Sequence, residues 1–273
     1  MKENLMSKTK TVIVGANHAG IAAANTLLDT YPDQEVVMID RNTNLSYLGC
    51  GTALWVGRQI ESYEDLFYTN KEAFEAKGAQ IYMETTVEKI DFNKKSVYCK
   101  KNNGEEFVET YDKLILATGS APINPDIPGR NLKNVEFLKL FQDGQTVDAA
   151  MAKADVKTVA VIGAGYIGVE IAEAAKRRGK NVLLFDAAER CLPNYYDKWF
   201  TDDMDKVLSE NGIELHYGEL AKEYKGTDKV TAIITDKGEY TADLVINAIG
   251  FRPNNQLGKD HLTLFTNGAY LVN

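Results

Sequence analysis

The chain has 273 residues, of which 44% are hydrophobic and 26% charged, a composition typical of a soluble globular protein with one large or two ordinary domains. Its 31 basic and 39 acidic residues give a net charge of −8, which disfavours nucleic acid or an anionic membrane as the main partner. No apolar run is long enough to span a membrane, and the polar N-terminus has no apolar signal core. Three widely spaced cysteines favour a reducing compartment, so we expect a cytoplasmic location and no metal site.

The first recognisable elements form a βαβ unit. Residues 11–14 are an apolar run that ends at Gly15. A helical pattern of small residues then covers 19–28. Residues 35–39 predict a second strand, which Asp40 closes. Asp40 lies 25 residues beyond Gly15, close to the spacing at which a carboxylate reaches a ribose bound at a glycine loop.

A meander and a buried strand come next. Residues 81–91, 96–100 and 105–111 predict the three strands of an antiparallel meander. The Asn-Asn-Gly sequence at 102–104 supplies the turn between the last two of them. Residues 113–117 are apolar without alternation, which predicts a buried parallel strand.

The same βαβ order returns in the second half of the chain. Residues 158–162 are an apolar run that ends at Gly163. A helix is predicted over 166–178, followed by a strand over 181–185 that Asp186 closes. Asp186 lies 23 residues beyond Gly163, again close to the spacing that suits a ribose.

This internal duplication indicates the fold class. A buried strand at 243–249 repeats the strand at 113–117, and the stretch 122–129, with three prolines and a glycine, is interpreted as a linker. We therefore expect an α/β protein of two Rossmann-like domains joined near residue 121. Each has a three-layer ββα architecture with a small β-meander.

The second glycine loop has the full dinucleotide-binding pattern, Gly163-x-Gly165-x-x-Gly168. The first glycine allows a tight turn, the second lets the backbone approach a pyrophosphate, and the third lets helix and strand pack closely. Asp186 favours NADH because it would accept hydrogen bonds from a ribose and repel a 2′-phosphate, although Arg190 lies nearby in the sequence. The alternative is a glycine-rich helix start without a ligand.

The first glycine loop departs from this pattern, because Asn17 stands between Gly15 and Gly20 at the middle glycine position. Asparagine tolerates unusual backbone angles better than most residues, so the turn remains possible. The closing Asp40 still suits a ribose. Two dinucleotide sites in one chain suggest electron transfer between a nicotinamide and a flavin.

One cysteine stands in a reactive setting. Cys50 is flanked by glycines and precedes a predicted helix over 52–57. A thiolate there could attack a peroxide or a disulfide, and no other cysteine is close enough in the sequence to form an internal dithiol. It would therefore cycle through sulfenic acid or a mixed disulfide. The alternative is a buried structural cysteine, which is our interpretation of Cys99 and Cys191.

Five ordered motifs resemble the single-cysteine flavoprotein disulfide reductases, a group within the pyridine nucleotide-disulfide oxidoreductases. The motifs cover residues 12–28, 46–57, 117–120, 163–170 and 249–254. The group contains NADH oxidases, NADH peroxidases and coenzyme A-disulfide reductases, and the sequence is most similar to the water-forming NADH oxidase branch. The resemblance implies FAD and NADH as cofactors.

The resemblance also implies residue roles. Cys50 matches the redox cysteine, and His18 matches the active-site histidine beside it, with a polar loop residue as the alternative. Tyr166 matches an aromatic gate over the flavin, although it could simply pack on its helix. The residues that match the FAD site are Gly15, Asn17, His18, Ala19, Gly20, Asp40, Arg41, Cys50, Val87, Ala117, Thr118, Gly119, Ser120 and Lys139. The residues that match the NADH site are Gly163, Gly165, Ile167, Gly168, Asp186, Tyr195 and Gly250.

The implied reaction is the reduction of O2 to water by NADH, through FAD and through Cys50 alternating between thiolate and sulfenic acid. The alternatives in the same group are an NADH peroxidase or a coenzyme A-disulfide reductase. An alternative of another class is an inactive, truncated fragment that binds dinucleotides without turnover. O2 or peroxide would be the small-molecule acceptor, and the full-length relatives are expected to form homodimers.

The resemblance assigns residues 1–121 to the first part of an FAD-binding domain and 122–246 to an NADH-binding domain. Residues 247–273 would return to the FAD domain and leave it incomplete. The family's third flavin motif and its C-terminal dimerisation domain are absent from the sequence. We therefore expect a truncated chain with weaker flavin retention, poor solubility and little turnover.

Overall fold

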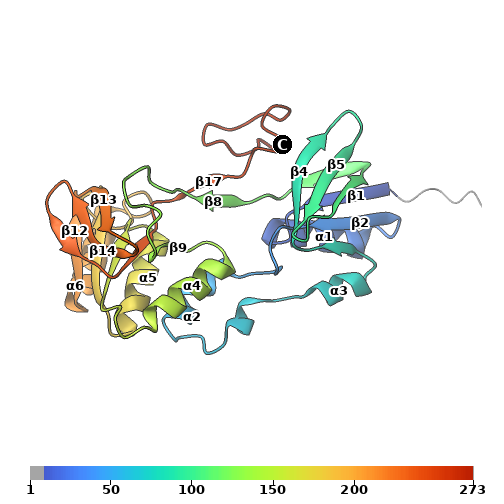
Figure 1. Cartoon of the computed structure of the whole chain (residues 1–273). Helices are drawn as coiled ribbons and strands as arrows, with labels where there is room; N and C mark the ends of the chain where they lie inside the picture. The colour runs from blue at the N-terminus through green and yellow to red at the C-terminus, as the bar shows by residue number, and fades with distance from the viewer. Residues whose placement is uncertain (1–8, 273) are drawn as a thin grey trace, which may run out of the picture. The chain divides into compact units, whose positions relative to one another are not determined.

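A computed structural model describes residues 9–272, which divide into two compact units (Figure 1). The first unit takes in the described residues up to 48, residues 67–120 and the described residues from 253 on. The second takes in residues 49–66 and 121–252. Each unit has a parallel sheet and an antiparallel meander, so the predicted α/β class with two Rossmann-like folds is confirmed.

The first unit is built on a four-stranded parallel sheet in the order β3-β2-β1-β7. Its sheet strands and helices are β1 (Thr9–Val14), α1 (His18–Thr30), β2 (Gln34–Ile39), α3 (Lys71–Ala76), β3 (Gln80–Tyr82) and β7 (Lys113–Leu116). The turn from β1 into α1 places the first glycine loop at the carboxyl end of the central strand.

Alternate side chains of this sheet enter two different cores. Ile13 and Met38 pack against α1 and α3, whereas Val12 and Ile39 pack against the meander on the other face. The meander consists of β4 (Thr85–Asp91), β5 (Ser96–Lys101) and β6 (Glu106–Thr110). Because both faces are covered, the sheet strands read as continuous apolar runs.

The predicted single strand over 81–91 is wrong, because the chain forms two strands there in different sheets. β3 is the edge of the parallel sheet, and β4 begins the meander. Glu84 between them has a φ of 52°, a left-handed conformation that turns the chain from one sheet to the other. The turn predicted at 102–104 is present, with Gly104 donating its N–H to the Lys101 carbonyl.

The second unit repeats this plan with a five-stranded parallel sheet in the order β12-β11-β10-β16-β9. Its sheet strands are β9 (Val135–Phe137), β10 (Thr158–Ile162), β11 (Asn181–Asp186), β12 (Ile213–Tyr217) and β16 (Leu244–Asn247). Its longer helices are α4 (Phe141–Met151), α5 (Tyr166–Arg177) and α6 (Lys198–Glu210). Its meander consists of β13 (Ala221–Gly226), β14 (Val230–Thr235) and β15 (Glu239–Thr241). Ile162, Phe185 and Val245 from the sheet share a buried cluster with Tyr224 and Ile233 of this meander.

Residues 49–66 also belong to the second unit, although they follow β2 in the sequence. They form η1 (Gly49–Gly51), α2 (Thr52–Val56) and η2 (Tyr63–Leu66). Gly57 at the end of α2 lies so close to α5 that an added Cβ would be 3.1 Å from Ala174. The compact unit therefore differs from the predicted domain ranges, which placed this segment with residues 1–121, because α2 packs on α4 and α5.

Two arginines and one carboxylate fasten α2. Arg178 donates from Nη1 to the Val56 carbonyl at 3.0 Å and to Asp148 Oδ1 at 2.6 Å. Arg58 Nη2 lies 2.8 Å from the same Asp148 oxygen. Because the last carbonyls of a helix lack partners within the helix, the Arg178 contact satisfies one that this short helix would leave open.

The chain passes between the units through β8 (Ser120–Pro122) and β17 (Phe251–Pro253), which pair in a two-stranded sheet. The expected linker at 122–129 is ordered at its end, since the Pro128 carbonyl accepts a hydrogen bond from the Tyr224 N–H.

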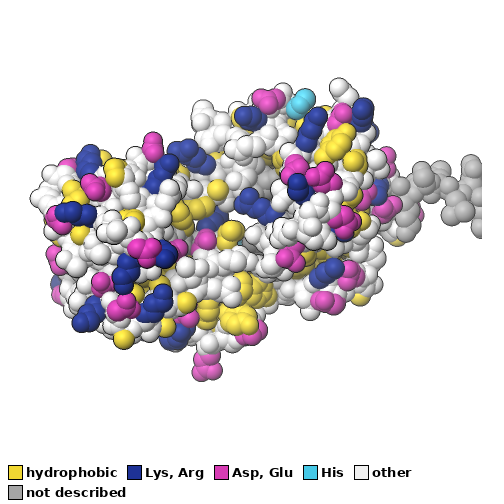
Figure 2. Space-filling view, viewed as in Figure 1, with side chains coloured by type: hydrophobic (Ala, Val, Ile, Leu, Met, Phe, Trp, Pro, Cys, Tyr) yellow, Lys and Arg dark blue, Asp and Glu magenta, His cyan; other side chains and the backbone are white. Residues whose placement is uncertain are grey.

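Basic and acidic side chains are interspersed over the face drawn in Figure 2. Within residues 9–272, no helix combines the length and the apolar composition that a membrane crossing requires.

Candidate functional site

The second glycine loop has two glycines that the fold requires and one that it does not. Gly163 has a φ of +104°, and an added Cβ would lie 2.5 Å from the Ala248 carbonyl oxygen. An added Cβ at Gly168 would lie 1.7 Å from the Gly163 carbonyl oxygen. Gly165 has an ordinary extended backbone, and an added Cβ would meet no heavy atom within 4 Å. The open space beside Gly165, at the start of α5, fits the close approach of a ligand phosphate.

The first glycine loop has the same construction. Gly15 has a φ of +112°, and an added Cβ would lie 2.1 Å from the Ala117 carbonyl oxygen. An added Cβ at Gly20 would lie 1.8 Å from the Gly15 carbonyl oxygen. Asn17 at the middle position is exposed, with an extended backbone of φ −114° and ψ −160°. The unusual backbone angles that we considered for Asn17 are therefore not needed, and the asparagine is accommodated because its side chain points into open space.

Each loop is tied to the acid that closes the second strand. Asp40 Oδ2 accepts the Ala16 N–H at 2.6 Å, and Asp186 Oδ2 accepts the Ala164 N–H at the same distance. The other oxygen of Asp186 accepts the Ala188 N–H at 2.7 Å. These bonds hold both carboxylates at the carboxyl end of their sheets, beside the glycine turns. Loop and acid are thus hydrogen-bonded in both units, and the binding of a ribose by these acids stays a prediction.

Arg190 is engaged elsewhere in the second unit. Its Nη1 donates to Thr201 Oγ1 at 3.0 Å, and its Nη2 donates to the Pro193 carbonyl at 3.3 Å. A guanidinium held in this way is committed to the segment that leads into α6. The sequence proximity of Arg190 to Asp186 therefore does not by itself weaken the preference for NADH over NADPH.

Among the three cysteines, only the Cys50 thiol is exposed. Cys50 lies in η1, just before α2, and the Thr52 hydroxyl closes this turn by donating to the Gly49 carbonyl at 2.8 Å. Cys99 and Cys191 are buried, and burial raises the pKa of each thiol to about 12. Since the thiolate is the reactive form, the two buried cysteines are inert near neutral pH.

His18 is the first residue of α1 and belongs to the first unit. Its Nδ1 lies 3.3 Å from the Tyr68 hydroxyl, and the two rings are nearly parallel at 4°. Cys50 belongs to the second unit, so the catalytic pairing of His18 with Cys50 remains a prediction. Among the described residues, no group of three or more His, Cys, Asp or Glu side chains could hold a metal ion.

The comparison with known families identifies the family of this chain. The family profile of the pyridine nucleotide-disulphide oxidoreductases matches residues 9–273. The chain belongs to this family.

The similar proteins are longer than this chain. An NADH oxidase of Lactococcus lactis subsp. cremoris is 60% identical over 265 residues, which cover 96% of this chain and 59% of that protein. A water-forming NADH oxidase from Lactobacillus brevis, bound to NADH, has a TM-score of 0.92 at 37% identity and covers 96% of this chain and 58% of its own. The reduced CoADR-RHD of Bacillus anthracis has a TM-score of 0.90 at 27% identity, over 95% of this chain and 47% of its own. The chain thus spans about three fifths or less of the length of these relatives.

The remaining residues predicted for the flavin site lie on several elements. The Thr118 hydroxyl donates to the Asn254 carbonyl at 2.6 Å, and Asn254 returns a bond from Nδ2 to the Thr118 carbonyl at 2.8 Å. Gly119 has a φ of +63°, with open space beside it. Asn254 lies in the motif at 249–254 that carries the family resemblance. Its part in holding the turn at 118–119 was not predicted from the sequence. Val87 is buried in the meander core, Arg41 and Ala19 are exposed, and Ala117 and Ser120 are half-buried.

Three tyrosines gather at the start of α5. The Tyr166 hydroxyl lies 3.1 Å from that of Tyr196, and its ring centroid lies 4.4 Å from that of Tyr195. Tyr166 was predicted as a gate over the flavin and Tyr195 as a contact of NADH, whereas Tyr196 was given no role. Elsewhere in the unit, Lys139 Nζ lies 4.9 Å from the centre of the Phe251 ring. The last predicted residues are Ile167, which is half-buried, and Gly250, which has a φ of +105°.

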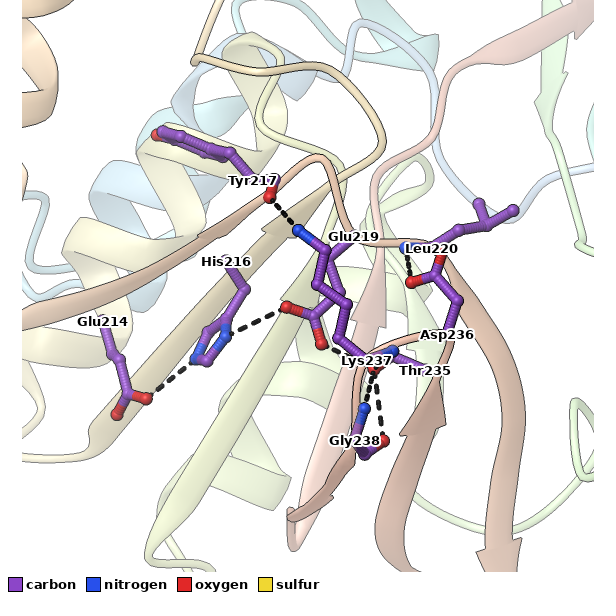
Figure 3. A network of polar contacts seen from close by, with 9 residues as sticks. All are labelled: Glu214, His216, Tyr217, Glu219, Leu220, Thr235, Asp236, Lys237 and Gly238. Atoms are coloured by element: carbon purple, nitrogen blue, oxygen red, sulfur yellow. Dashed lines mark hydrogen bonds and ion pairs between the residues drawn. The ribbon is translucent and has the colours of Figure 1, made fainter.

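A polar network that includes the buried side chains of Glu219 and Thr235 was not predicted from the sequence (Figure 3). His216 on β12 faces Glu219, and the Thr235 hydroxyl on β14 donates to the same carboxylate at 2.5 Å. Burial alone would raise the pKa of Glu219. Hydrogen bonds from Thr235 and Tyr240 and the charge of His216 outweigh it and lower that pKa below its ordinary value. The sign of this network in the sequence is that His216 lies on β12, which pairs with β11, and that Glu219 follows three residues later.

Proposed function

We propose that this chain is the dinucleotide-binding part of an NADH oxidase that reduces O2 to water. The observation that carries the proposal is the pair of matched glycine loops, each open at its middle position and each tied to an acid. The exposed Cys50 adds a redox group to these two binding sites. The similarity to NADH oxidases supports the proposal, because the matched region contains both loops and Cys50.

The second loop is the proposed NADH site. The free N–H groups at the start of α5 would bind the pyrophosphate, which the open side of Gly165 allows to approach. Asp186 would accept hydrogen bonds from the ribose hydroxyls and would repel a 2′-phosphate. Tyr166 and Tyr195 would pack against the bound nucleotide, and Gly250 would contact it through its backbone.

The first loop is the proposed FAD site. Its N–H groups at the start of α1 would bind the FAD pyrophosphate, and Asp40 would bind the ribose. The turn at 118–119, held by Asn254, would contact the flavin part, with Val87 and Lys139 as further contacts. When bound, FAD supplies a ring that accepts hydride from NADH and delivers electrons to the oxygen substrate.

Cys50 is proposed to complete the reduction of peroxide. Its thiolate attacks one peroxide oxygen, so that a sulfur–oxygen bond forms, the oxygen–oxygen bond breaks, and the departing hydroxide takes a proton to become water. Two electrons from a second NADH then break the sulfur–oxygen bond. They restore the thiolate and release the oxygen, with protons, as the second water. In total, two NADH, one O2 and two protons give two NAD⁺ and two waters, with His18 as the proposed proton donor.

The same residues support two related reactions, an NADH peroxidase and a coenzyme A-disulfide reductase. In the second of these, Cys50 would form a mixed disulfide. The similarity to the CoADR-RHD structure favours keeping this candidate. A non-catalytic chain that binds NADH without turnover is the candidate of another class. A cytoplasmic location of this chain and a homodimeric state of its full-length relatives remain predictions.

The absorption spectrum of the purified chain tests this proposal, after FAD is added and the excess washed away. We expect a flavin spectrum that is only weakly retained, as the sequence predicts, and that NADH bleaches under argon and O2 restores. Comparing O2, hydrogen peroxide and coenzyme A disulfide as acceptors then separates the three enzymes. A colourless chain that still binds NADH would support the non-catalytic candidate and contradict the oxidase.

A further inference from the structure

His216 has a carboxylate at each of its two ring nitrogens (Figure 3). Its Nε2 lies 2.8 Å from Glu214 Oε1, and its Nδ1 lies 3.4 Å from Glu219 Oε2. A neutral imidazole has one N–H and could donate to only one of these oxygens, leaving a ring lone pair against the other carboxylate. The doubly protonated ring can donate to both. Only the doubly protonated form of His216 satisfies both contacts at once.

The pair formed by His216 and Glu219 is enclosed. Their side chains are 12% and 4% exposed, whereas Glu214 is 64% exposed. The His216 ring stacks on Phe185 of β11 at 4.5 Å, and Tyr240 of β15 packs edge-on at the same distance. The titratable groups that face His216 are therefore Glu214, Glu219 and the Tyr240 phenol. A buried carboxylate that loses its cation is strongly disfavoured, so loss of the His216 proton would disturb Glu219.

Glu219 is bonded directly to the turn that contains Asp186. Its backbone N–H donates to the Asp186 carbonyl at 3.0 Å, and the Gly218 N–H donates to the Ala188 carbonyl at 2.9 Å. The Ala188 N–H in turn donates to Asp186 Oδ1. A shift of the segment at 218–219 would therefore move both ends of the turn that aims the Asp186 carboxylate.

We propose that protonated His216, acting through Glu219, is a positioning residue for the ribose contact of Asp186. Loss of its proton weakens NADH binding and lowers the preference for NADH over NADPH, because Asp186 both binds the ribose and repels the 2′-phosphate. This inference rests on the proposed NADH site.

The test is the dissociation constant of NADH and of NADPH, measured by nucleotide fluorescence at pH 6 and pH 8 on the whole chain. In the unsubstituted chain, the preference for NADH falls by about three- to tenfold between these pH values, as expected for partial loss of a charge-assisted bond. His216→Gln has the low preference at both pH values. His261→Gln, a histidine of the first unit, behaves as the unsubstituted chain does.

Glu214→Gln is the decisive variant, because it changes an exposed side chain and so should not disturb folding. Glutamine removes the negative charge beside Nε2, so the cationic ring loses one of its two carboxylate partners and is held less strongly. We expect the preference for NADH in this variant to fall at a lower pH than in the unsubstituted chain. If its preference falls at the same pH as in the unsubstituted chain, or if the unsubstituted chain shows no pH dependence, the inference is wrong.

Two further measurements separate this inference from the proposed NADH site. Asp186→Ala should lose the preference at both pH values, and if it does not, the proposed site itself fails and the inference falls with it. If Asp186→Ala has this effect while His216→Gln does not, only the inference is overturned. Amide hydrogen exchange at 186–189 requires no nucleotide. Exchange there should become faster in His216→Gln than in His261→Gln, and equal rates would also overturn the inference.

Discussion

Replacement of Gly165 by alanine separates ligand binding from folding at the second glycine loop. The residue has φ −77° and ψ −171°, a conformation open to any L-amino acid, and its new Cβ would meet no atom of the protein within 4 Å. The substitution should therefore leave the fold intact. It should even stabilise the folded chain by about 0.4–1 kcal/mol, because alanine restricts the unfolded backbone.

The effect on NADH should have the opposite sign. The methyl group would occupy the space through which a pyrophosphate approaches the start of α5, and at least one charge-assisted N–H bond to phosphate would be lost. Such a bond contributes about 1.5–3 kcal/mol, so the dissociation constant should rise by about ten- to a hundredfold. The stabilisation of the fold corresponds to a rise in melting temperature of no more than about 4 °C.

NADH fluorescence titration and thermal unfolding followed by circular dichroism measure the two effects. Gly168→Ala is the matched comparison, because its Cβ would lie 1.7 Å from the Gly163 carbonyl oxygen and should disrupt the fold. A Gly165→Ala chain that binds NADH as tightly as the unsubstituted chain would refute the assignment of the loop. A Gly165→Ala chain that fails to fold would refute the geometric argument.

Three further predictions concern other parts of the molecule. Asp148→Ala leaves the largely buried Arg178 without its carboxylate and should lower the free energy of unfolding by about 2 kcal/mol. The melting temperature should therefore fall by roughly 4–8 °C. An unchanged melting temperature would contradict the account of α2. Glu219→Gln should lower the free energy of unfolding at pH 7. The difference in free energy of unfolding between variant and unsubstituted chain should shrink as the pH falls through the lowered pKa of Glu219, because that carboxylate stabilises the fold only while ionised. Urea unfolding at several pH values measures this difference. A difference that stays constant with pH would contradict the prediction. Iodoacetamide at pH 7 should label Cys50 alone in the folded chain, and mass spectrometry that found either buried cysteine labelled would show the thiol environments to be wrong.

The two glycine loops could be predicted because their chemistry is local. The fold needs the first and third glycines of each loop. A side chain at Gly15 would strike the carbonyl oxygen of Ala117, which follows β7, and a side chain at Gly168 would strike the carbonyl oxygen of Gly163 within the same loop. That requirement leaves a fixed spacing in the sequence. The acids that close the second strands follow from the length of a βαβ unit, so Asp40 and Asp186 could be placed as well.

The parts that could not be predicted depend on contacts between distant segments. No glycine or proline interrupts residues 81–91, and only the pairing of β3 with β2 separates them into two strands at Glu84. The segment at 49–66 follows the first βαβ unit but packs on helices more than 80 residues away, through Arg178 and Asp148. The contact of His216 with Glu219 follows no periodic pattern, so it could not be connected with Asp186 before the fold was known.

The amount of NADH oxidised for each O2 consumed tests the central claim most directly, when measured on the FAD-loaded chain and on its Cys50→Ser variant. We expect two NADH per O2 and no released peroxide in the unsubstituted chain. In the variant we expect one NADH per O2, with peroxide accumulating, because the thiol that reduces it is absent. A variant that still oxidises two NADH per O2 without releasing peroxide would contradict the role of Cys50, and a chain that consumes no O2 with FAD present would contradict the oxidase proposal itself.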